Sequence, residues 1–447
     1  MNAFINNERP FVTASAPGRL DVMGGIADYS GSLLLQMPIK QRTTVTMQKT
    51  TGHLIVVRTG SNKKYREFSV DIKSLQQIAS DDWASFIRQQ PEGSWAIYVL
   101  GSLLVLHLHK SMPLEGLHVL VTSAVPEGKG VSSSAALEVA VMKALQQMYQ
   151  LSLSETELPV LAQKAENLMV GAPCGLMDQL STYLGQKNRL LPLQCQPHTV
   201  YPSLPIPAGI QFTAIDSGIR HAVSGASYGD VRTAAFMSYS IIAMQAGVDS
   251  DDLLKARNTG DFSGLPYNGF LANIPLSIFK EQYQSLLPES MKGSDFLHHY
   301  KHSIDKVTHI DADRIYHLRA CGSHPVEENF RIGLFQQLLM AYRKTSDKQA
   351  ILKQLGELML QSHAGYNAIG LGNDHTNHLV EKVREAGDNS GVYGARITGG
   401  GSGGAVCILC EGAKGVQTAR QIWKNYMTQF KKRTLFFQGS SSGAYYS

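Results

Sequence analysis

Short alternations of apolar and polar residues fill the beginning of the chain. Clear examples are Thr44–Met47 and Leu54–Val57, and turn-forming residues separate them. An alternation with a period of two is typical of strands that bury one face. Residues 11–70 are therefore expected to form a β-rich unit.

The pattern then lengthens to helical periods, with one strand between them. Helices are predicted over 83–106, 134–149 and 159–170, and a strand over 116–122. The helix at 134–149 carries apolar residues around most of its circumference, which is typical of a buried helix. Prolines and short strands return at 190–206, so we expect a first lobe over residues 1–205.

The second half of the chain alternates strands and helices. A strand is predicted at 212–216, helices at 229–247, 330–344, 350–365 and 377–386, and a pair of strands at 394–410. This order is typical of a mixed α+β lobe. We expect it to span residues 206–447, with a Gly-, Ser- and Tyr-rich tail at 439–447 that lies at the periphery.

Composition narrows the class of protein. The chain has 447 residues, of which 43% are hydrophobic and 17% charged, and it contains 41 glycines. Glycine is enriched without a collagen-like period or long Gly/Ser tracts, which excludes fibrous and disordered classes. The net charge of +5 is spread along the chain, so no nucleic-acid partner is predicted.

Cysteine usage and hydropathy bear on the compartment. The five cysteines are odd in number and widely spaced, which favours a reducing compartment over a disulfide framework. No run approaches the roughly 18 apolar residues of a membrane span, and no export signal is apparent. A cytoplasmic protein without a membrane partner is expected.

A glycine-rich turn at Pro126–Glu138, with the sequence PEGKGVSSSAALE, leads into the helix at 134–149. Free N–H groups and the positive end of a helix dipole suit a phosphate chain. Gly128 and Gly130 would let the backbone approach it closely. The Walker pattern is absent because Gly130 follows Lys129. A simple serine cap on a buried helix remains the alternative.

A second glycine cluster, ITGGGSGGAVCIL, occupies Ile397–Leu409. It formally contains G-x-G-x-x-G, but a strand-like run follows in place of a helix, so a dinucleotide-binding interpretation is poor. A tight loop between strands, packed against another loop or a ligand, is predicted, with a plain hairpin turn as the alternative.

Charged residues stand among small ones in two further segments. Arg19, Asp21 and Asp28 lie within APGRLDVMGGIADYSG, while Glu166 and Asp178 flank a Gly-Ala-Pro-Cys-Gly turn. Their spacing alone does not bring them together. The same residue types also occur as ordinary surface charges.

Taken together, these four motifs resemble the GHMP kinase superfamily and, within it, the galactokinase-like sugar 1-kinases, over essentially the whole chain. The segments VGAPCGLMDQ, IDSGIRHAVSGA and HPVEENFR strengthen the likeness to an arabinose-specific branch. The resemblance implies an α+β fold of two lobes, with the active site between them. The N-terminal lobe would be a ribosomal-protein-S5-like β-α-β unit and the C-terminal lobe ferredoxin-like.

The resemblance also implies ATP and Mg²⁺ as cofactors. ATP would be bound by Trp95 near the adenine and, along the phosphates, by Pro126, Gly128, Lys129, Gly130, Val131, Ser132, Ser133 and Ser134. Ser134 and Glu166 would hold magnesium. Asp178 would be the catalytic base, with Arg19 beside it to keep it ionised, and whether Asp178 removes the proton or only orients the hydroxyl stays open.

The sugar would contact Arg19, Gly25, Ile26, Asp28, Gly175, Asp178 and Tyr228. Galactokinases usually carry Gly-Glu-His-Thr-Asp-Tyr where this chain has Gly24–Tyr29, so Gly25 and Ile26 replace the polar pair that faces the C6 hydroxymethyl group. A hydroxyl left unpaired costs about 1 to 3 kcal/mol. Tyr228 is equally compatible with an ordinary aromatic at a helix start.

These replacements favour a sugar without C6. We therefore expect phosphorylation of the anomeric hydroxyl of L-arabinose by a monomer whose partners are the sugar and ATP. A galactokinase and a non-catalytic sugar sensor on the same scaffold are the alternatives.

Overall fold

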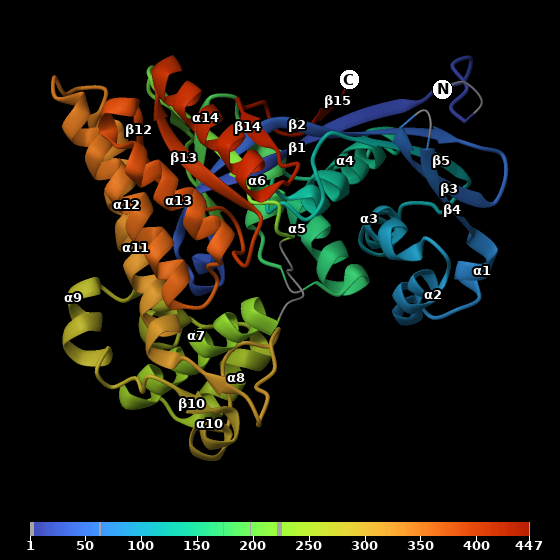
Figure 1. Cartoon of the computed structure of the whole chain (residues 1–447). Helices are drawn as coiled ribbons and strands as arrows, with labels where there is room; N and C mark the ends of the chain where they lie inside the picture. The colour runs from blue at the N-terminus through green and yellow to red at the C-terminus, as the bar shows by residue number, and fades with distance from the viewer. Residues whose placement is uncertain (1–3, 62–63, 173, 197, 221–225, 447) are drawn as a thin grey trace.

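A computed structural model describes residues 4–61, 64–172, 174–196, 198–220 and 226–446. The described residues form two main sheets, of nine and four strands and each covered by helices, and a small sheet of two strands (Figure 1). The mixed α+β class predicted from the sequence is confirmed. Among the described residues, none of the helices combines the length and the hydropathy needed to cross a bilayer.

The first sheet has the strand order β15-β1-β2-β5-β3-β4, and β6 pairs with the other end of β2 and with β7 and β8. Its strands are β1 (Val12–Met23), β2 (Leu33–Lys49), β3 (Leu54–Ser61), β4 (Lys64–Asp71), β5 (Leu117–Ser123), β6 (Arg189–Cys195), β7 (His198–Val200), β8 (Leu204–Pro205) and β15 (Tyr445–Tyr446). Only the β3 and β5 pair is parallel among the pairings of this sheet in the described residues.

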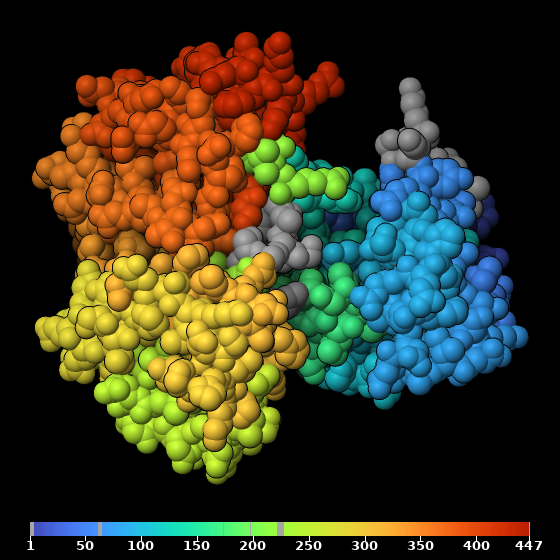
Figure 2. Space-filling model, turned by 60° about the horizontal axis from the view of Figure 1, so that its bottom comes forward, coloured from blue at the N-terminus to red at the C-terminus, as the bar shows by residue number. Residues whose placement is uncertain are grey.

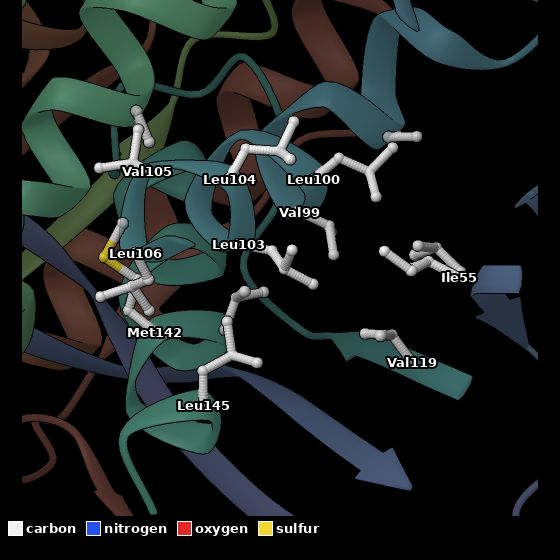
Figure 3. Close-up of a cluster of buried hydrophobic side chains, with 14 of the residues drawn as sticks. Ile55, Val99, Leu100, Leu103, Leu104, Val105, Leu106, Val119, Met142 and Leu145 are labelled. Carbon is white, nitrogen blue, oxygen red and sulfur yellow. The ribbon is translucent and has the colours of Figure 1, made fainter. Parts of the chain in front are cut away.

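Helices cover the first sheet on one face. They are α1 (Ile72–Gln76), α2 (Trp83–Gln89), α3 (Gly93–Lys110), α4 (Ser133–Met148), α5 (Glu157–Lys164), the π-helical turn η3 (Ala165–Val170) and α6 (Met177–Leu184). Figure 3 shows Val99, Leu100 and Leu103 of α3 on the side near Ile55 and Val119 of the strands, and Leu106 of α3 beside Met142 of α4; all belong to one buried cluster. In β3 and β5 the buried residues Ile55, Val57, Leu117, Val119 and Val121 alternate with more exposed ones, which explains the alternation seen at Leu54–Val57.

The second sheet has the order β12-β13-β9-β14 and is antiparallel throughout its described pairings. Its strands are β9 (Ile210–Asp216), β12 (Val392–Ile397), β13 (Ala405–Glu411) and β14 (Phe436–Gln438), and the long helices of this lobe are α11 (Leu318–Ala341), α12 (Lys348–Ala368), α13 (Asp374–Ala386) and α14 (Gly412–Phe430). Thus Thr398–Gly404 is a loop between adjacent strands, as predicted.

A mostly helical region lies at the lower end of the molecule in Figure 1. It contains α7 (Ala226–Gln245), α8 (Ser250–Thr259), η4 (Pro266–Gly269), η5 (Leu271–Asn273), α9 (Leu276–Ile278), η6 (Phe279–Tyr283), β10 (Met291–Lys292), α10 (Gly293–Tyr300) and β11 (Ile315–Tyr316). Its core is a separate cluster of buried residues that also takes in Ile26 and Tyr29. The helical region therefore packs directly against the turn η1 (Gly25–Ser30).

The chain passes from the first sheet to the second between β8 and β9, that is, between Pro205 and Ile210. The division into lobes at residues 205 and 206 stays a prediction, because the first sheet also takes its edge strand β15 from the other end of the chain.

The tail at 439–447 lies at the surface, as expected, with Tyr445 and Tyr446 43% and 39% exposed, but its described residues make defined contacts. Tyr445 and Tyr446 pair with Ser15 and Ala14 of β1. The guanidinium of Arg42 donates to Ser441 Oγ, Ser442 O and Gly443 O at 3.0, 2.5 and 2.9 Å. Its composition does not reveal these hydrogen-bond partners, which depend on Arg42 of a distant strand.

We predict that Arg42→Ala lowers the free energy of unfolding by about 1 to 3 kcal/mol, the usual loss for hydrogen bonds made by a charged donor. Denaturant unfolding would measure it. Arg433→Ala is the matched control, because Arg433 is exposed and belongs to the same lobe as the tail's start. Equal effects of the two substitutions would show that the tail contributes nothing to stability.

Candidate active site

Arg19 and Asp178 form the central ion pair of the site. Arg19 Nε donates to Asp178 Oδ1 at 2.9 Å and Nη2 donates to Oδ2 at 3.0 Å, so the contact is bidentate. Arg19 lies on β1 and Asp178 in the first turn of α6. The third guanidinium nitrogen, Nη1, donates to Gly130 O at 2.6 Å. One arginine thus connects Asp178, the expected base, to the glycine-rich turn at 126–134, which we call the phosphate loop after its predicted role.

A large cavity of about 970 Å³ opens between the first lobe and the helical region. In Figure 2 the blue-to-teal surface of the first lobe and the yellow-to-orange surface of the helical region face each other across the middle of the molecule. The cavity is lined by the phosphate loop and α3 on one side and by Asp230, His309 and Arg314 on the other. Trp95 lies in this wall, and its contact with the adenine stays a prediction.

The phosphate loop has the backbone geometry that its glycines suggest. Gly128 and Gly130 both have φ of +68°, a conformation that favours glycine. Ser132 also has a positive φ, +59°, and its hydroxyl is buried with no hydrogen-bond partner in the described structure. Ser132, Ser133 and Ser134 face the cavity at the start of α4. A hydroxyl so held is a ready donor for an anion.

Three residues expected at the phosphates do not line this cavity. Pro126 is half-buried beside it. Val131 is 1% exposed and packs in the core, while its carbonyl accepts from Arg19 N at 3.1 Å. Lys129 Nζ lies 3.1 Å from Asp216 Oδ2, a carboxylate of β9 that is buried. Their roles in binding ATP stay predictions.

The fold brings Glu166 and Ser134 together, although they are 32 positions apart in the sequence. Burial raises the pKa of Glu166, and a hydrogen bond from the Ser134 hydroxyl opposes that rise. Gln179 Nε2 donates to Glu166 Oε2 at 2.6 Å. Behind this pair, Glu138 is fully buried, and its Oε1 has no partner in the described structure. Burial, reinforced by the charge of Glu166, raises the pKa of Glu138 well above its usual value.

A second, smaller cavity adjoins the first. It is lined by Arg19, Gly25, Ile26, Asp28, Cys174, Gly175, Met177, Asp178, Tyr228 and Gly400. All seven residues expected to contact the sugar are in this set. Arg19 and Asp178 line the large cavity as well, so the two cavities meet at the ion pair.

Asp28 is the buried carboxylate of the smaller cavity. Burial raises its pKa to about 7, and the nearby positive charge of Arg232 limits the rise. Arg232 is itself held by Asp305 through two hydrogen bonds of 2.9 Å. Tyr228 is 7% exposed and stands edge-on to Tyr29, with ring centroids 6.3 Å apart.

Gly175 has a steric role that its place in the turn did not reveal. A Cβ atom at this position would lie 2.0 Å from Asp28 Oδ2. The glycine therefore makes room for the Asp28 carboxylate. Pro173 of this turn, and residues 221–225 of the IDSGIRHAVSGA motif, lie outside the described residues.

The loop Thr398–Gly404 packs against the phosphate loop. A Cβ at Gly130 would lie 3.3 Å from Thr398 O, and one at Gly404 would lie 3.1 Å from Lys129 O. Gly399, Gly401, Gly403 and Gly404 all have positive φ. This loop therefore reaches the site, and Gly400 contributes to the smaller cavity.

Sequence reasoning missed several residues of the site: Glu138, Gln179, Arg232, Asp305 and Tyr366. Glu138 and Gln179 stand inside the quoted motifs and could have been noticed as polar residues in apolar helices. Arg232 lies four residues after Tyr228 and so was within reach of the sequence analysis, whereas Asp305 and Tyr366 lie far from the motifs and no local pattern marks them.

Three family profiles match the chain. They describe the N-terminal domain of GHMP kinases (residues 98–186), the C-terminal domain of GHMP kinases (348–429) and a galactokinase galactose-binding signature (2–49). The chain thus carries segments similar to both domains of GHMP kinases, in this order and one in each lobe.

Particular relatives refine this assignment. An L-arabinokinase from Arabidopsis thaliana is 39% identical over 98% of this chain, which spans only 46% of that protein. A galactokinase from Chloroflexus aggregans is 29% identical over 91% of this chain and 85% of its own length. A crystal structure of Lactococcus lactis galactokinase with galactose aligns with a TM-score of 0.71 at 20% identity, over 98% of this chain and 95% of that one. The last likeness concerns the fold alone.

The titration of Asp28 gives a prediction for pH dependence. A carboxylate accepts hydrogen bonds from sugar hydroxyls when it is ionised, and the pKa of Asp28 is raised to about 7. We expect kcat/KM for the sugar, measured at saturating ATP, to rise with pH and level off above about 7. Asp28→Asn should give low activity without this titration. A flat profile down to pH 5 would contradict the assignment.

Proposed function

We propose that this chain transfers the γ-phosphoryl group of ATP to the anomeric hydroxyl of L-arabinose, giving L-arabinose 1-phosphate. The observation that carries the proposal is the position of the Arg19–Asp178 pair where the two cavities meet. A phosphate chain in the large cavity and a sugar in the small one would have their reacting ends at this pair.

The chemistry follows from that arrangement. The anomeric oxygen bonds to the γ-phosphorus as the bond to the bridging oxygen of ADP breaks, and the hydroxyl proton passes to Asp178 or leaves under its influence. Arg19 holds the carboxylate in position through two hydrogen bonds and brings positive charge next to the transferring group. The serines at the start of α4 supply donors to the phosphates.

Magnesium would be held by the Ser134 hydroxyl and the Glu166 carboxylate. Among the described residues there is no group of three or more His, Cys, Asp or Glu side chains placed to bind a metal. The donor set nevertheless suits Mg²⁺, which usually takes one or two carboxylates together with substrate phosphates and water. The partnerless Oε1 of Glu138 behind Glu166 agrees with a site that accommodates positive charge. Magnesium would neutralise charge on the phosphates.

The choice of L-arabinose rests on the wall of the smaller cavity at Gly25 and Ile26. No polar side chain stands at these positions, and Ile26 is 1% exposed. The likeness to the L-arabinokinase supports the same substrate, while the galactokinase relatives support D-galactose as the second candidate. A cytoplasmic location and a monomeric state stay predictions.

A panel of sugars with coupled detection of ADP tests the substrate. We expect kcat/KM to be about 5- to 160-fold greater for L-arabinose than for D-galactose, because an unpaired hydroxyl costs about 1 to 3 kcal/mol. A preference for D-galactose would make the chain a galactokinase.

Asp178→Asn separates an enzyme from a sugar sensor. We predict that kcat falls at least about a hundredfold, the usual contribution of a general base, while the sugar still binds by calorimetry. Asp251→Asn, at an exposed position of α8, is the matched control and should leave both quantities unchanged. An Asp178→Asn variant with unchanged kcat would refute the role of this carboxylate.

A further inference from the structure

Tyr366 lies near the end of α12, fully buried behind the smaller cavity. Its hydroxyl donates to Gly399 O at 2.7 Å and accepts from Ile26 N at 3.1 Å. Gly399 belongs to the loop Thr398–Gly404, which we call the glycine-rich loop. Ile26 belongs to the turn η1, and residues of this turn line the smaller cavity. One hydroxyl therefore joins two segments that are far apart in the sequence.

The same hydroxyl fills the space that a side chain at position 25 would need. A Cβ atom on Gly25 would lie 1.6 Å from Tyr366 Oη and 2.9 Å from its Cζ. Gly25 also has a φ of +51°, which further favours glycine. Asp21 Oδ2 would also lie 2.8 Å from this Cβ, so the Tyr366 hydroxyl makes the closest of the contacts that leave room only for glycine at position 25.

The ring of Tyr366 is fixed by its surroundings. Arg396 Cζ stands 5.2 Å from the ring centroid, and His324 packs edge-on at 5.6 Å. Arg396 is in turn paired with Asp21 at 2.7 Å, and both side chains are fully buried. Removal of the hydroxyl alone would leave the ring in place, so its contribution is separable from packing.

The glycine-rich loop connects the Tyr366 hydroxyl with the Arg19–Asp178 ion pair. A Cβ on Gly399 would lie 3.2 Å from Arg19 Nη2 and 3.2 Å from Gly130 O, so the loop is in close contact with the ion pair and the phosphate loop. Gly400, the next residue, lines the smaller cavity. The position of Gly399 therefore affects both cavities.

We propose that Tyr366 is a positioning and specificity-determining residue: its hydroxyl sets the turn at Gly25 and Ile26 against the glycine-rich loop and keeps side chains out of position 25. The inference deepens, and rests on, the proposed sugar kinase activity. The proposal explains why the wall of the smaller cavity consists of backbone at Gly25 and of an apolar side chain at Ile26. A sugar substituent at this wall meets no polar side chain, which suits a pentopyranose.

Tyr366→Phe tests the positioning role. It leaves Ile26 N and Gly399 O without their partner, and we expect kcat/KM for L-arabinose to fall about tenfold or more, mainly through KM for the sugar. KM for ATP should change less than KM for the sugar, because Ile26 and Gly400 line the smaller cavity and not the large one. Tyr239→Phe is the matched control, since Tyr239 is 1% exposed and its hydroxyl donates to Pro266 O at 2.7 Å. It should lower stability without changing KM for the sugar, and identical kinetics for both variants would overturn the proposal.

A double-mutant cycle tests the contact without any need for activity. Gly25→Ala should lower Tm strongly in the wild-type background, because the new methyl group meets the hydroxyl. In the Tyr366→Phe background the same substitution should lower Tm less, because the nearest ring atom is then the carbon 2.9 Å away. The cost of the positive φ is common to both backgrounds and cancels. Equal losses would refute the proposed complementarity.

The two experiments keep the two proposals apart. If the wild-type chain phosphorylates none of the sugars tested, the proposed function fails, while the Tm cycle still decides whether Tyr366 excludes side chains from position 25. If the wild-type chain is an active arabinose kinase and the cycle shows no coupling, only the inference about Tyr366 fails.

Discussion

The buried ion pair between Asp21 and Arg396 is the contact on which the arrangement of the site depends. Asp21 lies on β1 of the first sheet and Arg396 on β12 of the second, and neither side chain is exposed. Two charges removed from water are tolerated only when further hydrogen bonds satisfy them. Asp21 accepts from Gln36 Nε2 at 2.6 Å, and Arg396 donates to Ser362 Oγ at 2.9 Å. The sheets are therefore joined by a buried network that satisfies Nε and Nη1 of Arg396, while its Nη2 has no partner in the described structure.

The same strand, β1, also carries Arg19 of the Arg19–Asp178 ion pair. Arg19 and Asp21 are two positions apart on β1, and a spacing of two places side chains on one face of a strand. One of them contacts Asp178 and the phosphate loop, and the other contacts Arg396. The strand thereby relates the reacting groups of the first lobe to the glycine-rich loop that follows β12. This is a physical reason for the dense clustering of charged and small residues in the segment at 16–31.

Much of this organisation could be predicted from the sequence. The strands and the helices α3, α4 and α12 follow from hydrophobic period, and the phosphate loop from its glycines and serines before a helix. The helix α7 was predicted at 229–247, but the rest of the helical region and α14 were not, because their patterns are short or polar. Gly175 illustrates what a sequence cannot supply: its glycine is required by Asp28, a residue of another segment. The same holds for Tyr366 and Gly25, whose relation exists only in three dimensions.

The edge strand β15 has a consequence for how the chain folds. The first sheet receives a strand from residues 445–446, and Arg42 binds Gly443 across 401 positions of sequence. Contacts of such separation form late, because the intervening chain must first be ordered. During synthesis, β1 would remain a bare sheet edge until almost the entire chain described here has left the ribosome. An unpaired edge invites pairing with other chains, so we expect truncation or slow synthesis of the tail to appear first as aggregation of nascent protein.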